Sequence, residues 1–241
     1  MTPQQQIGLV LIGLLILLTF GRSLLSNPLS LLFTVAGLVV AITVHEFGHA
    51  WVANALGDHT AAYQGRVSLN PVRHFDPIGA LMILFTFASG FGIGWGKPVP
   101  VSPARLAGGR HGMAAVAVAG AAMNLLTAAV LALSLYLSGP SLAQVSGGAI
   151  VRALLTRVVF VNVYLAVFNI IIALPPLDGY NLLVNVLPLS LTFRLRQLEQ
   201  YGPILLILVI LGSQMRLLGF NLVGVVVGVP SQLILGLLHV A

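Results

Sequence analysis

Residues 29–56 read LSLLFTVAGLVVAITVHEFGHAWVANAL. The stretch is long enough to cross a bilayer, because a spanning helix needs about 20 mostly apolar residues. It nevertheless contains three ionisable residues, His45, Glu46 and His49. Such groups are costly in lipid unless they face a cavity, a partner or a metal ion. The stretch therefore predicts a membrane helix that carries a functional site.

The composition of the whole chain also indicates a membrane protein. Of 241 residues, 58% are hydrophobic and only 7% are charged, whereas soluble globular proteins carry about 25% charged residues. The net charge of +6 comes from scattered Lys and Arg without a basic run, so we expect no nucleic-acid partner. The absence of cysteine excludes disulfides, thiolate metal ligands and a cysteine nucleophile. We expect the chain to lie in the lipid bilayer of the cell membrane.

We expect an all-α multi-pass membrane protein with about six transmembrane helices. The apolar stretches that predict them are Ile7–Leu25, Leu29–Leu56, His111–Leu137, Ile150–Leu174, Tyr201–Leu218 and Phe220–Val240. The first has no basic leader and no clear cleavage site, so we expect a retained helix rather than a signal peptide. We divide the chain into an N-terminal helix (1–28), a membrane-embedded core (29–185) and C-terminal helices (186–241).

One further apolar segment, Pro77–Ile93, is bounded by a proline and by a glycine-rich end. If it crossed the membrane, the basic residues on its two sides would lie on opposite faces. If it enters and returns, these residues share one face, as the bias of Lys and Arg toward the cytoplasm favours: Arg66, Arg73, Lys97, Arg105 and Arg110. We therefore expect a re-entrant segment, which is tolerated where protein or a wet cavity shields the backbone.

The polar interval before this segment predicts a short strand. Residues 62–70 read AYQGRVSLN, in which Val67 and Leu69 alternate with polar residues. An exposed strand edge can bind an extended peptide through backbone hydrogen bonds.

The HEFGH sequence at residues 45–49 predicts a catalytic zinc site. His45 and His49 are four apart, so on an α-helix they project from one face and can bind one ion. Glu46 lies between them, where it can take a proton from water at the metal. The alternatives are a chance pattern or polar residues that satisfy one another, and the cost of burying three ionisable groups in lipid argues against both.

A catalytic zinc usually has three protein ligands, so one more residue is required. Asp178 is the best candidate, since it directly follows the apolar run that ends near Leu174. Pro175 and Pro176 end that helix, and Gly179 allows a tight turn beside the acid. The alternative is an ordinary capping or turn aspartate. The other acids lie in polar loops, where we expect solvated or capping roles: Asp58, Asp76 and Glu199.

Four motifs occur together between about Leu29 and Asn185: HEFGH (45–49), GRVSLNPVRHFDPIG (65–79), KPVPV (97–101) and LDG (177–179). In combination they resemble the site-2 protease family of intramembrane zinc metalloproteases. The resemblance implies that His45, His49 and Asp178 bind one Zn²⁺ per chain and that Glu46 is the general base. It also implies regulated intramembrane proteolysis: single-span membrane proteins would be cleaved within their transmembrane helices, near the cytoplasmic side.

Two asparagines extend the resemblance. AGAAMN, which ends at Asn124, is similar to the family's Gly-x-x-x-Asn element, although Ala121 stands where proline is common. Asn169 resembles the asparagine that precedes LDG in the family, and the resemblance implies that both asparagines bind substrate. Asn162 lies on nearly the same helical face as Asn169. Interhelical hydrogen bonding is the alternative for this pair.

The other histidines are expected to be surface or interface residues, because nothing at ligand spacing joins them: His59, His74, His111 and His239. Two other functions stay open at this point. One is a metal-ion transporter, in which intramembrane His and Asp form a transit site. The other is a catalytically inactive scaffold of the same family. A transporter predicts ligands along a route, whereas here they cluster around one glutamate.

Overall fold

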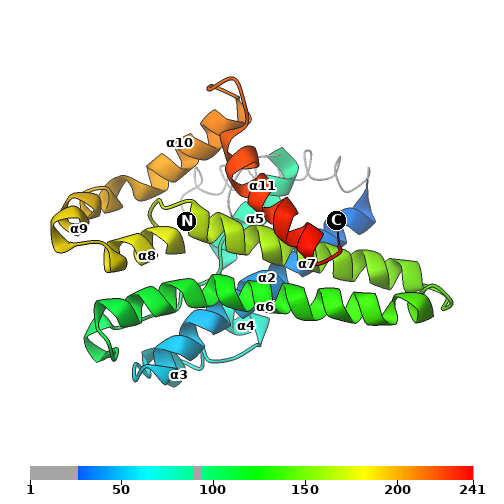
Figure 1. The fold of residues 1–241 in the computed structure, drawn as a ribbon, viewed down its shortest axis with the longest axis horizontal. Helices are drawn as coiled ribbons and strands as arrows, with labels where there is room; N and C mark the ends of the chain where they lie inside the picture. The colour runs from blue at the N-terminus through cyan, green and yellow to red at the C-terminus, as the bar shows by residue number, and fades with distance from the viewer. Residues whose placement is uncertain (1–26, 90–93, 241) are drawn as a thin grey trace, which may run out of the picture.

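The structure is a computed structural model that describes residues 27–89 and 94–240. Its α-helices are α2 (Pro28–Ala55), α3 (Thr60–Tyr63), α4 (Pro71–His74), α5 (Pro77–Ser89), α6 (Arg110–Leu142), α7 (Gly148–Ile171), α8 (Asp178–Val186), α9 (Leu189–Arg196), α10 (Gly202–Gln214) and α11 (Leu222–Leu237) (Figure 1). Two short 3₁₀ helices cover Pro103–Arg105 and Glu199–Tyr201. The described residues contain no strand, which confirms the all-α class. The predicted helix Ile7–Leu25 lies outside the described residues.

Four of the described helical segments are long and apolar enough to cross a membrane: Pro28–Ala55, Arg110–Leu142, Gly148–Ile171 and Leu189–Gln214. The first three cover the predicted stretches that begin at Leu29, His111 and Ile150. The fourth begins well before the predicted Tyr201, because the interval Asp178–Gln200 is itself mostly helical. Helix α11 is apolar but shorter. Six spans are therefore not confirmed over the described part of the chain.

Helices α2, α6 and α7 pack against one another and form the core of the fold (Figure 1). Small residues line the inner face of α6: Ala114, Ala117, Gly120, Ala121, Ala128 and Ala132. A Cβ atom at Gly48 would lie only 2.6 Å from the carbonyl oxygen of Ala119, so α2 and α6 approach closely. Membrane helices associate through such small residues, because their backbones can then make extensive contact.

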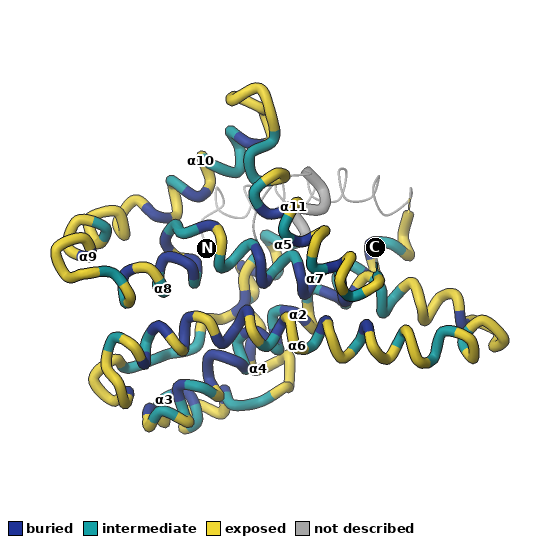
Figure 2. The backbone as a smooth tube through the Cα atoms, viewed as in Figure 1, coloured by how far each residue is buried: buried dark blue, intermediate teal, exposed yellow. Residues whose placement is uncertain are grey.

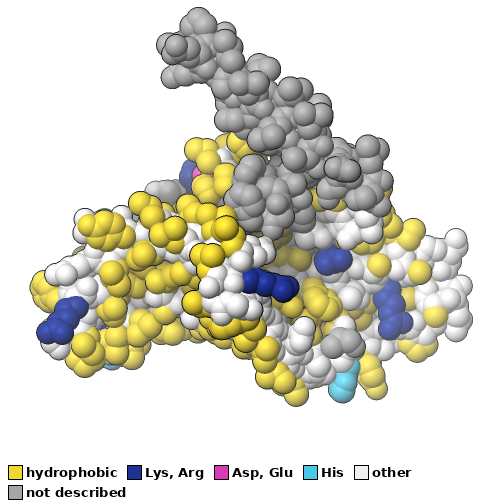
Figure 3. Space-filling view, turned by 90° about the horizontal axis from the view of Figure 1, so that it is seen from above, with side chains coloured by type: hydrophobic (Ala, Val, Ile, Leu, Met, Phe, Trp, Pro, Cys, Tyr) yellow, Lys and Arg dark blue, Asp and Glu magenta, His cyan; other side chains and the backbone are white. Residues whose placement is uncertain are grey.

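The outer faces of these helices are apolar. Buried residues lie where the helices face one another, while exposed residues lie on the outer sides of the helices and in the turns between them (Figure 2). Large hydrophobic side chains are exposed there, including Leu32, Leu126, Leu133 and Ile150. Hydrophobic side chains also dominate the face shown in Figure 3, on which charged groups are few. Such a surface suits lipid rather than water, so the protein is a membrane protein.

The segment expected to be re-entrant returns to its starting point. Helix α5 has 13 residues, fewer than the roughly 20 that a span requires. Beyond it, the backbone N–H of Lys97 donates to the carbonyl oxygen of His74 at 2.8 Å, so the chain comes back beside the residue from which it left. This geometry agrees with a re-entrant segment, although residues 90–93 lie outside the described part.

The short strand expected at residues 62–70 is absent, and this prediction was wrong. Gly65 has a φ of +67°, and a turn follows it, in which the N–H of Arg66 donates to Ala61 at 2.9 Å. The N–H of Ser68 donates back to Arg66 at 2.9 Å. These donors are used within the segment itself, so it presents no strand edge. The bounding Asn70 caps α4 instead, by accepting from the N–H of Val72.

Candidate metal centre

Two imidazoles and one carboxylate converge at the junction of α2 and α8. The Nε2 atoms of His45 and His49 lie 3.0 and 3.2 Å from Oδ2 of Asp178. Within residues 27–89 and 94–240, these three form the one group of at least three His, Cys, Asp or Glu residues close enough to hold a metal ion. Tetrahedral zinc with bonds of about 2.0–2.1 Å keeps its ligand atoms roughly 3.3 Å apart. The measured separations are therefore close to those a bound zinc requires.

Each ligand is placed by local structure. His45 and His49 lie one turn apart on α2, and Asp178 is the first residue of α8. Helix α8 starts directly against the end of α7, because a Cβ atom at Gly179 would lie 2.2 Å from the carbonyl oxygen of Ile170. From the sequence, Gly179 was expected to allow a tight turn beside Asp178. In the structure a glycine is required there because the backbones of α7 and α8 approach closely, and not because of a positive φ.

The far end of α8 is held by a residue that the sequence reasoning did not assign to the site. The guanidinium of Arg110, at the start of α6, donates to the carbonyl oxygens of Val184 and Leu187, each at 2.6 Å. It also donates to the hydroxyl of Thr192 at 3.0 Å. These carbonyls lie at the C-terminal end of α8, where a cation is stabilising, and they also accept from the hydroxyl of Thr192. Arg110 thereby keeps α8, and so Asp178, in register with α6.

Hydrogen bonds fix which nitrogen of each histidine faces the centre. Nδ1 of His45 lies 2.7 Å from Oδ1 of Asn124, and Nδ1 of His49 lies 2.7 Å from the carbonyl oxygen of Val116. The Asn124 amide is oriented unambiguously, because its nitrogen donates to Ala41 and to Asn162 at 2.8 Å each. Both Nδ1 atoms must therefore donate, and the neutral rings direct the lone pairs of their Nε2 atoms toward Asp178.

The centre fits a zinc ion. Oδ2 of Asp178 is buried and has no hydrogen-bond donor among the described residues. With neutral rings, three acceptor atoms therefore face one another, which is unfavourable unless a cation lies between them. Gly120 leaves the necessary room on α6, since a Cβ atom there would lie 2.5 Å from Nε2 of His49. Two imidazole nitrogens and one carboxylate oxygen are a ligand set that zinc accepts.

Glu46 lies beside this centre and contacts an extended segment of the chain. Its Oε2 atom accepts the backbone N–H of Val99 at 3.1 Å. The same segment passes α2 closely, because a Cβ atom at Gly96 would lie 2.5 Å from the side chain of Ile42 and 3.6 Å from Cγ of Glu46. The KPVPV motif pointed to this segment, but the sequence did not predict its contact with Glu46.

An apolar cavity of about 510 Å³ is lined by Ile42 and Thr43 of α2, one helical turn before Glu46. It lies between α2, α4 and α5, and its lining includes Val39, Ile42, Thr43, His74, Trp95 and Gly96. His74 is only 1% exposed, which corrects its expected surface or interface role. Its Nε2 donates to the carbonyl oxygen of Ser68 at 2.7 Å, and this bond stabilises the turn that replaces the expected strand.

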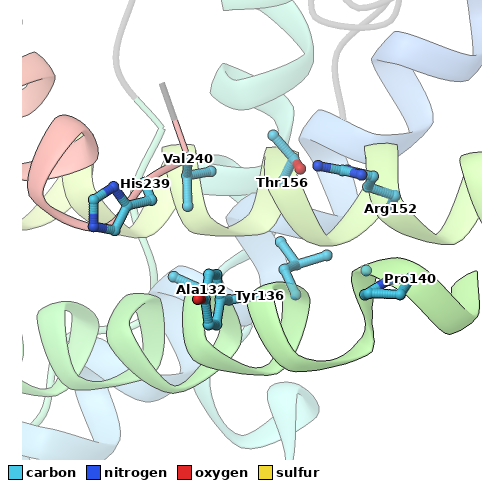
Figure 4. A pocket seen from close by; sticks show the side chains of 9 residues that line it. Ala132, Tyr136, Pro140, Arg152, Thr156, His239 and Val240 are labelled. Carbon is cyan, nitrogen blue, oxygen red and sulfur yellow. The ribbon is translucent and has the colours of Figure 1, made fainter.

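A second cavity, of about 640 Å³, lies between α6, α7 and the end of the chain (Figure 4). Its lining includes Tyr136, Arg152, Thr156 and His239. None of the three converging ligands lines it, so it is separate from the metal centre.

The two asparagines expected to bind substrate differ in their surroundings. Asn124 is completely buried, and among the described residues its amide bonds His45, Ala41 and Asn162. These contacts orient a metal ligand, and the substrate role of Asn124 stays a prediction. Its bond to Asn162 confirms interhelical hydrogen bonding for that residue. Asn169 donates to the carbonyl oxygen of Leu165 in its own helix at 3.0 Å, and its substrate role stays a prediction.

The acids outside the centre act in local structure. Asp76 accepts the N–H of Gly79 at 2.7 Å at the start of α5, and Glu199 accepts the hydroxyl of Tyr180 at 3.0 Å. Asp58 is buried rather than solvated. Burial raises the pKa of Asp58, but hydrogen bonds from Thr60 and from the N–H of Ser102, with the charge of Arg105, outweigh it and lower the pKa below its usual value.

Comparison with known proteins gives several relatives. The chain is 36% identical over 180 residues to "Putative zinc metalloprotease YwhC" of Bacillus subtilis strain 168, which covers 73% of this chain and 78% of that protein. It is 33% identical over 148 residues to "Putative zinc metalloprotease Rip2" of Mycobacterium tuberculosis, covering 61% of this chain and 54% of the relative. The Rip2 protein of Mycolicibacterium smegmatis is 27% identical over 194 residues, covering 80% of this chain and 71% of the relative.

No protein-family model and no solved structure matches the chain. The first of these relatives nevertheless aligns with most of both proteins, and its name agrees with the metal centre described above. The chain belongs to the site-2 protease family of intramembrane zinc metalloproteases.

Proposed function

We propose that the protein is an intramembrane zinc endopeptidase that hydrolyses peptide bonds of transmembrane-helix substrates near the cytoplasmic side of the membrane. The observation that carries this proposal is the convergence of His45, His49 and Asp178 on one point, with Glu46 beside them. A structural cluster would satisfy its own polar atoms. Here the oriented histidines and the unpaired Asp178 oxygen leave room for a cation instead.

His45, His49 and Asp178 would hold the zinc ion. Zinc, when bound, polarises a peptide carbonyl and makes water a nucleophile at neutral pH, since it lowers the pKa of water to about 7. Glu46 acts as the general base: its carboxylate accepts the proton of the attacking water and then gives it to the leaving amine. Burial of the site excludes bulk water, which strengthens these electrostatic interactions.

The substrate class follows from the surroundings of Glu46. The cavity of about 510 Å³ lies one helical turn from it and is lined mostly by apolar residues. It would accept the aliphatic or aromatic side chains of a transmembrane segment. We expect single-span membrane proteins as substrates, cleaved in regulated intramembrane proteolysis. Asn169 remains a candidate contact to the substrate backbone.

The sidedness of cleavage is inferred from charge. Basic residues gather in the loops around the centre, where Arg66 donates to the carbonyl oxygens of Arg73 and Lys97. Arg105 lies in the same region and donates to Thr60 at 3.3 Å. Lys and Arg are enriched in cytoplasmic loops. We therefore place the loops that carry Arg66 and Arg105 on the cytoplasmic side of the cell membrane.

The test is made on the full chain purified in detergent. We expect one zinc per chain by elemental analysis, and cleavage of a model transmembrane peptide that stops when Glu46 is replaced by Gln. A metal-ion transporter would instead move zinc into proteoliposomes without cleaving the peptide. An inactive scaffold would bind the peptide without cleaving it, and either result would refute the proposal.

A further inference from the structure

Residues 95–102 run as an extended segment across the side of Glu46. Three backbone N–H groups fasten the segment at successive points: that of Lys97 donates to His74 at 2.8 Å, that of Val99 donates to Glu46 at 3.1 Å, and that of Ser102 donates to Asp58 at 2.6 Å. The central bond of the three therefore ends on the side chain to which we assign proton transfer.

Two buried charged side chains hold the segment on either side of Val99. Arg66 is 3% exposed, and its guanidinium donates to the carbonyl oxygens of Lys97 and Pro98, the latter at 3.0 Å. Asp58 is 0% exposed and accepts the N–H of Ser102. Burying a charge is costly unless it is well bonded. Part of this cost is offset by bonds to the segment, from Arg66 to Lys97 and Pro98 and from Ser102 to Asp58.

The segment itself is stiff. Pro98 and Pro100 flank Val99, and each has a restricted φ and no N–H group. The N–H of Val99 is therefore the only backbone donor between residues 98 and 100. Alternating prolines also make this stretch a poor partner for a β-strand, because such residues cannot donate to a ladder. The motif is suited to presenting one donor at one place.

We propose that the Val99 N–H group, held in place by Arg66 and Asp58, positions the Glu46 carboxylate for proton transfer. The bond occupies Oε2 and fixes the rotation of the carboxylate, which leaves Oε1 to accept the proton. No other hydrogen bond to the Glu46 carboxylate occurs within the described residues. Arg66 and Asp58 are thus positioning residues, which act through Val99. The inference rests on the proposed function of Glu46.

Electrostatics supports the arrangement. Burial lowers the pKa of the Arg66 guanidinium, and the negative charge of Glu46 opposes this shift, so the two groups interact across the segment. Arginine stays charged in proteins. A fixed positive charge therefore lies beside the segment whose Val99 N–H contacts Glu46.

The direct test is Val99→Pro in the full-length, zinc-loaded protein. Proline keeps an extended backbone but removes the N–H that reaches Glu46. Val101→Pro is the matched control, because the N–H of Val101 has no hydrogen-bond partner within the described part. We expect kcat for a model transmembrane peptide to fall about 10- to 100-fold in Val99→Pro, as is typical when a supporting bond is lost. KM and zinc content should match those of Val101→Pro.

A second test addresses Arg66. Arg66→Lys keeps the charge but loses the planar fork that bonds the carbonyl oxygens of Arg73, Lys97 and Pro98. In a Val101→Cys background, the single thiol reports whether the segment is released. We expect Arg66→Lys to lower kcat and to speed maleimide labelling of that thiol, whereas the control Arg105→Lys should change neither.

The outcomes separate this inference from the proposed function. If Glu46→Gln is inactive while Val99→Pro keeps the kcat of Val101→Pro, the positioning role is refuted and the peptidase assignment stands. Loss of zinc from Val99→Pro would also refute it, since the segment would then support the metal ligands instead. If the unaltered protein does not cleave, or Glu46→Gln still cleaves, the proposed function itself fails.

Discussion

Nδ1 of His45, on α2, lies 2.7 Å from Oδ1 of Asn124, on α6. Asn124 in turn donates to Asn162, on α7, at 2.8 Å, and to the backbone of Ala41. A single buried amide thus joins the three core helices and orients a metal ligand. Packing of the core and geometry of the metal centre are coupled through this side chain.

Asn124→Ala should weaken zinc binding. Loss of the bond to Nδ1 frees the His45 ring to rotate and to change tautomer, and loss of such supporting partners typically costs about 10- to 100-fold in metal affinity or activity. Competition with a chelator measures the change in Kd. Asn185→Ala is the control, because among the described residues the Asn185 side chain bonds Asn181 of its own helix. Equal zinc affinity in the two variants would contradict the role of Asn124.

Glu46→Gln should retain zinc and lose hydrolysis. The amide has nearly the same shape as the carboxylate but cannot accept a proton at neutral pH. Removing general-base catalysis lowers kcat by about 10²–10⁴-fold. Peptide cleavage and zinc content are measured on the same preparation. A Gln variant that cleaves at nearly the unaltered rate would show that another group is the base.

Asp178→Ala should lose zinc and cleavage together. Two histidines alone are an incomplete ligand set for a catalytic zinc, and the carboxylate supplies the only negative charge among the three ligands. Zinc per chain is measured after dialysis against a mild chelator, with Asp76→Ala as the control. Full zinc occupancy in Asp178→Ala would remove this residue from the metal site.

Single cysteines at Ser68 and Ser102 should be labelled from the same side of intact vesicles. The two regions are tied together by hydrogen bonds, since Arg66 donates to Pro98 at 3.0 Å and Ser102 donates to Asp58 at 2.6 Å. The chain contains no other cysteine, so each label reports one position. Labelling from opposite sides would make Pro77–Ile93 a true crossing.

Asp58 should make stability depend on acid pH. Its pKa in the folded protein lies below the ordinary value of about 3.9. Its contribution is therefore complete above that ordinary value and is lost as the pH falls through the lower folded value. Asp58→Asn should be less stable by about 1–3 kcal/mol near neutral pH, because hydrogen bonds to a charge are lost. Thermal unfolding in detergent should show the same difference at pH 7 and pH 5 and a smaller difference at pH 3. A stability difference between Asp58→Asn and the unaltered protein that is the same at all three pH values would contradict the lowered pKa of Asp58.

Much of the architecture was evident from local patterns. The apolar stretches at Leu29, His111 and Ile150 are long enough to be helices in any context, because lipid forces the backbone to satisfy its own hydrogen bonds. HEFGH places two imidazoles on one face through helix geometry alone. The expected strand at residues 62–70 failed, because alternation of apolar residues does not tell whether a partner strand exists. In the structure, the N–H groups of Arg66 and Ser68 instead form hydrogen bonds in tight turns.

The sequence by itself determined the membrane class, the His45–Glu46–His49 constellation and the candidacy of Asp178, since these follow from composition, helical spacing and the cost of charge in lipid. Only the tertiary structure decided that Asp178 meets both histidines. It also decided that Asn124 orients His45 and that the N–H of Val99 reaches Glu46. The physical reason is that these contacts join segments distant in sequence: the first two depend on how closely α2 approaches α8 and α6, and the third on how the 95–102 segment is held against α2.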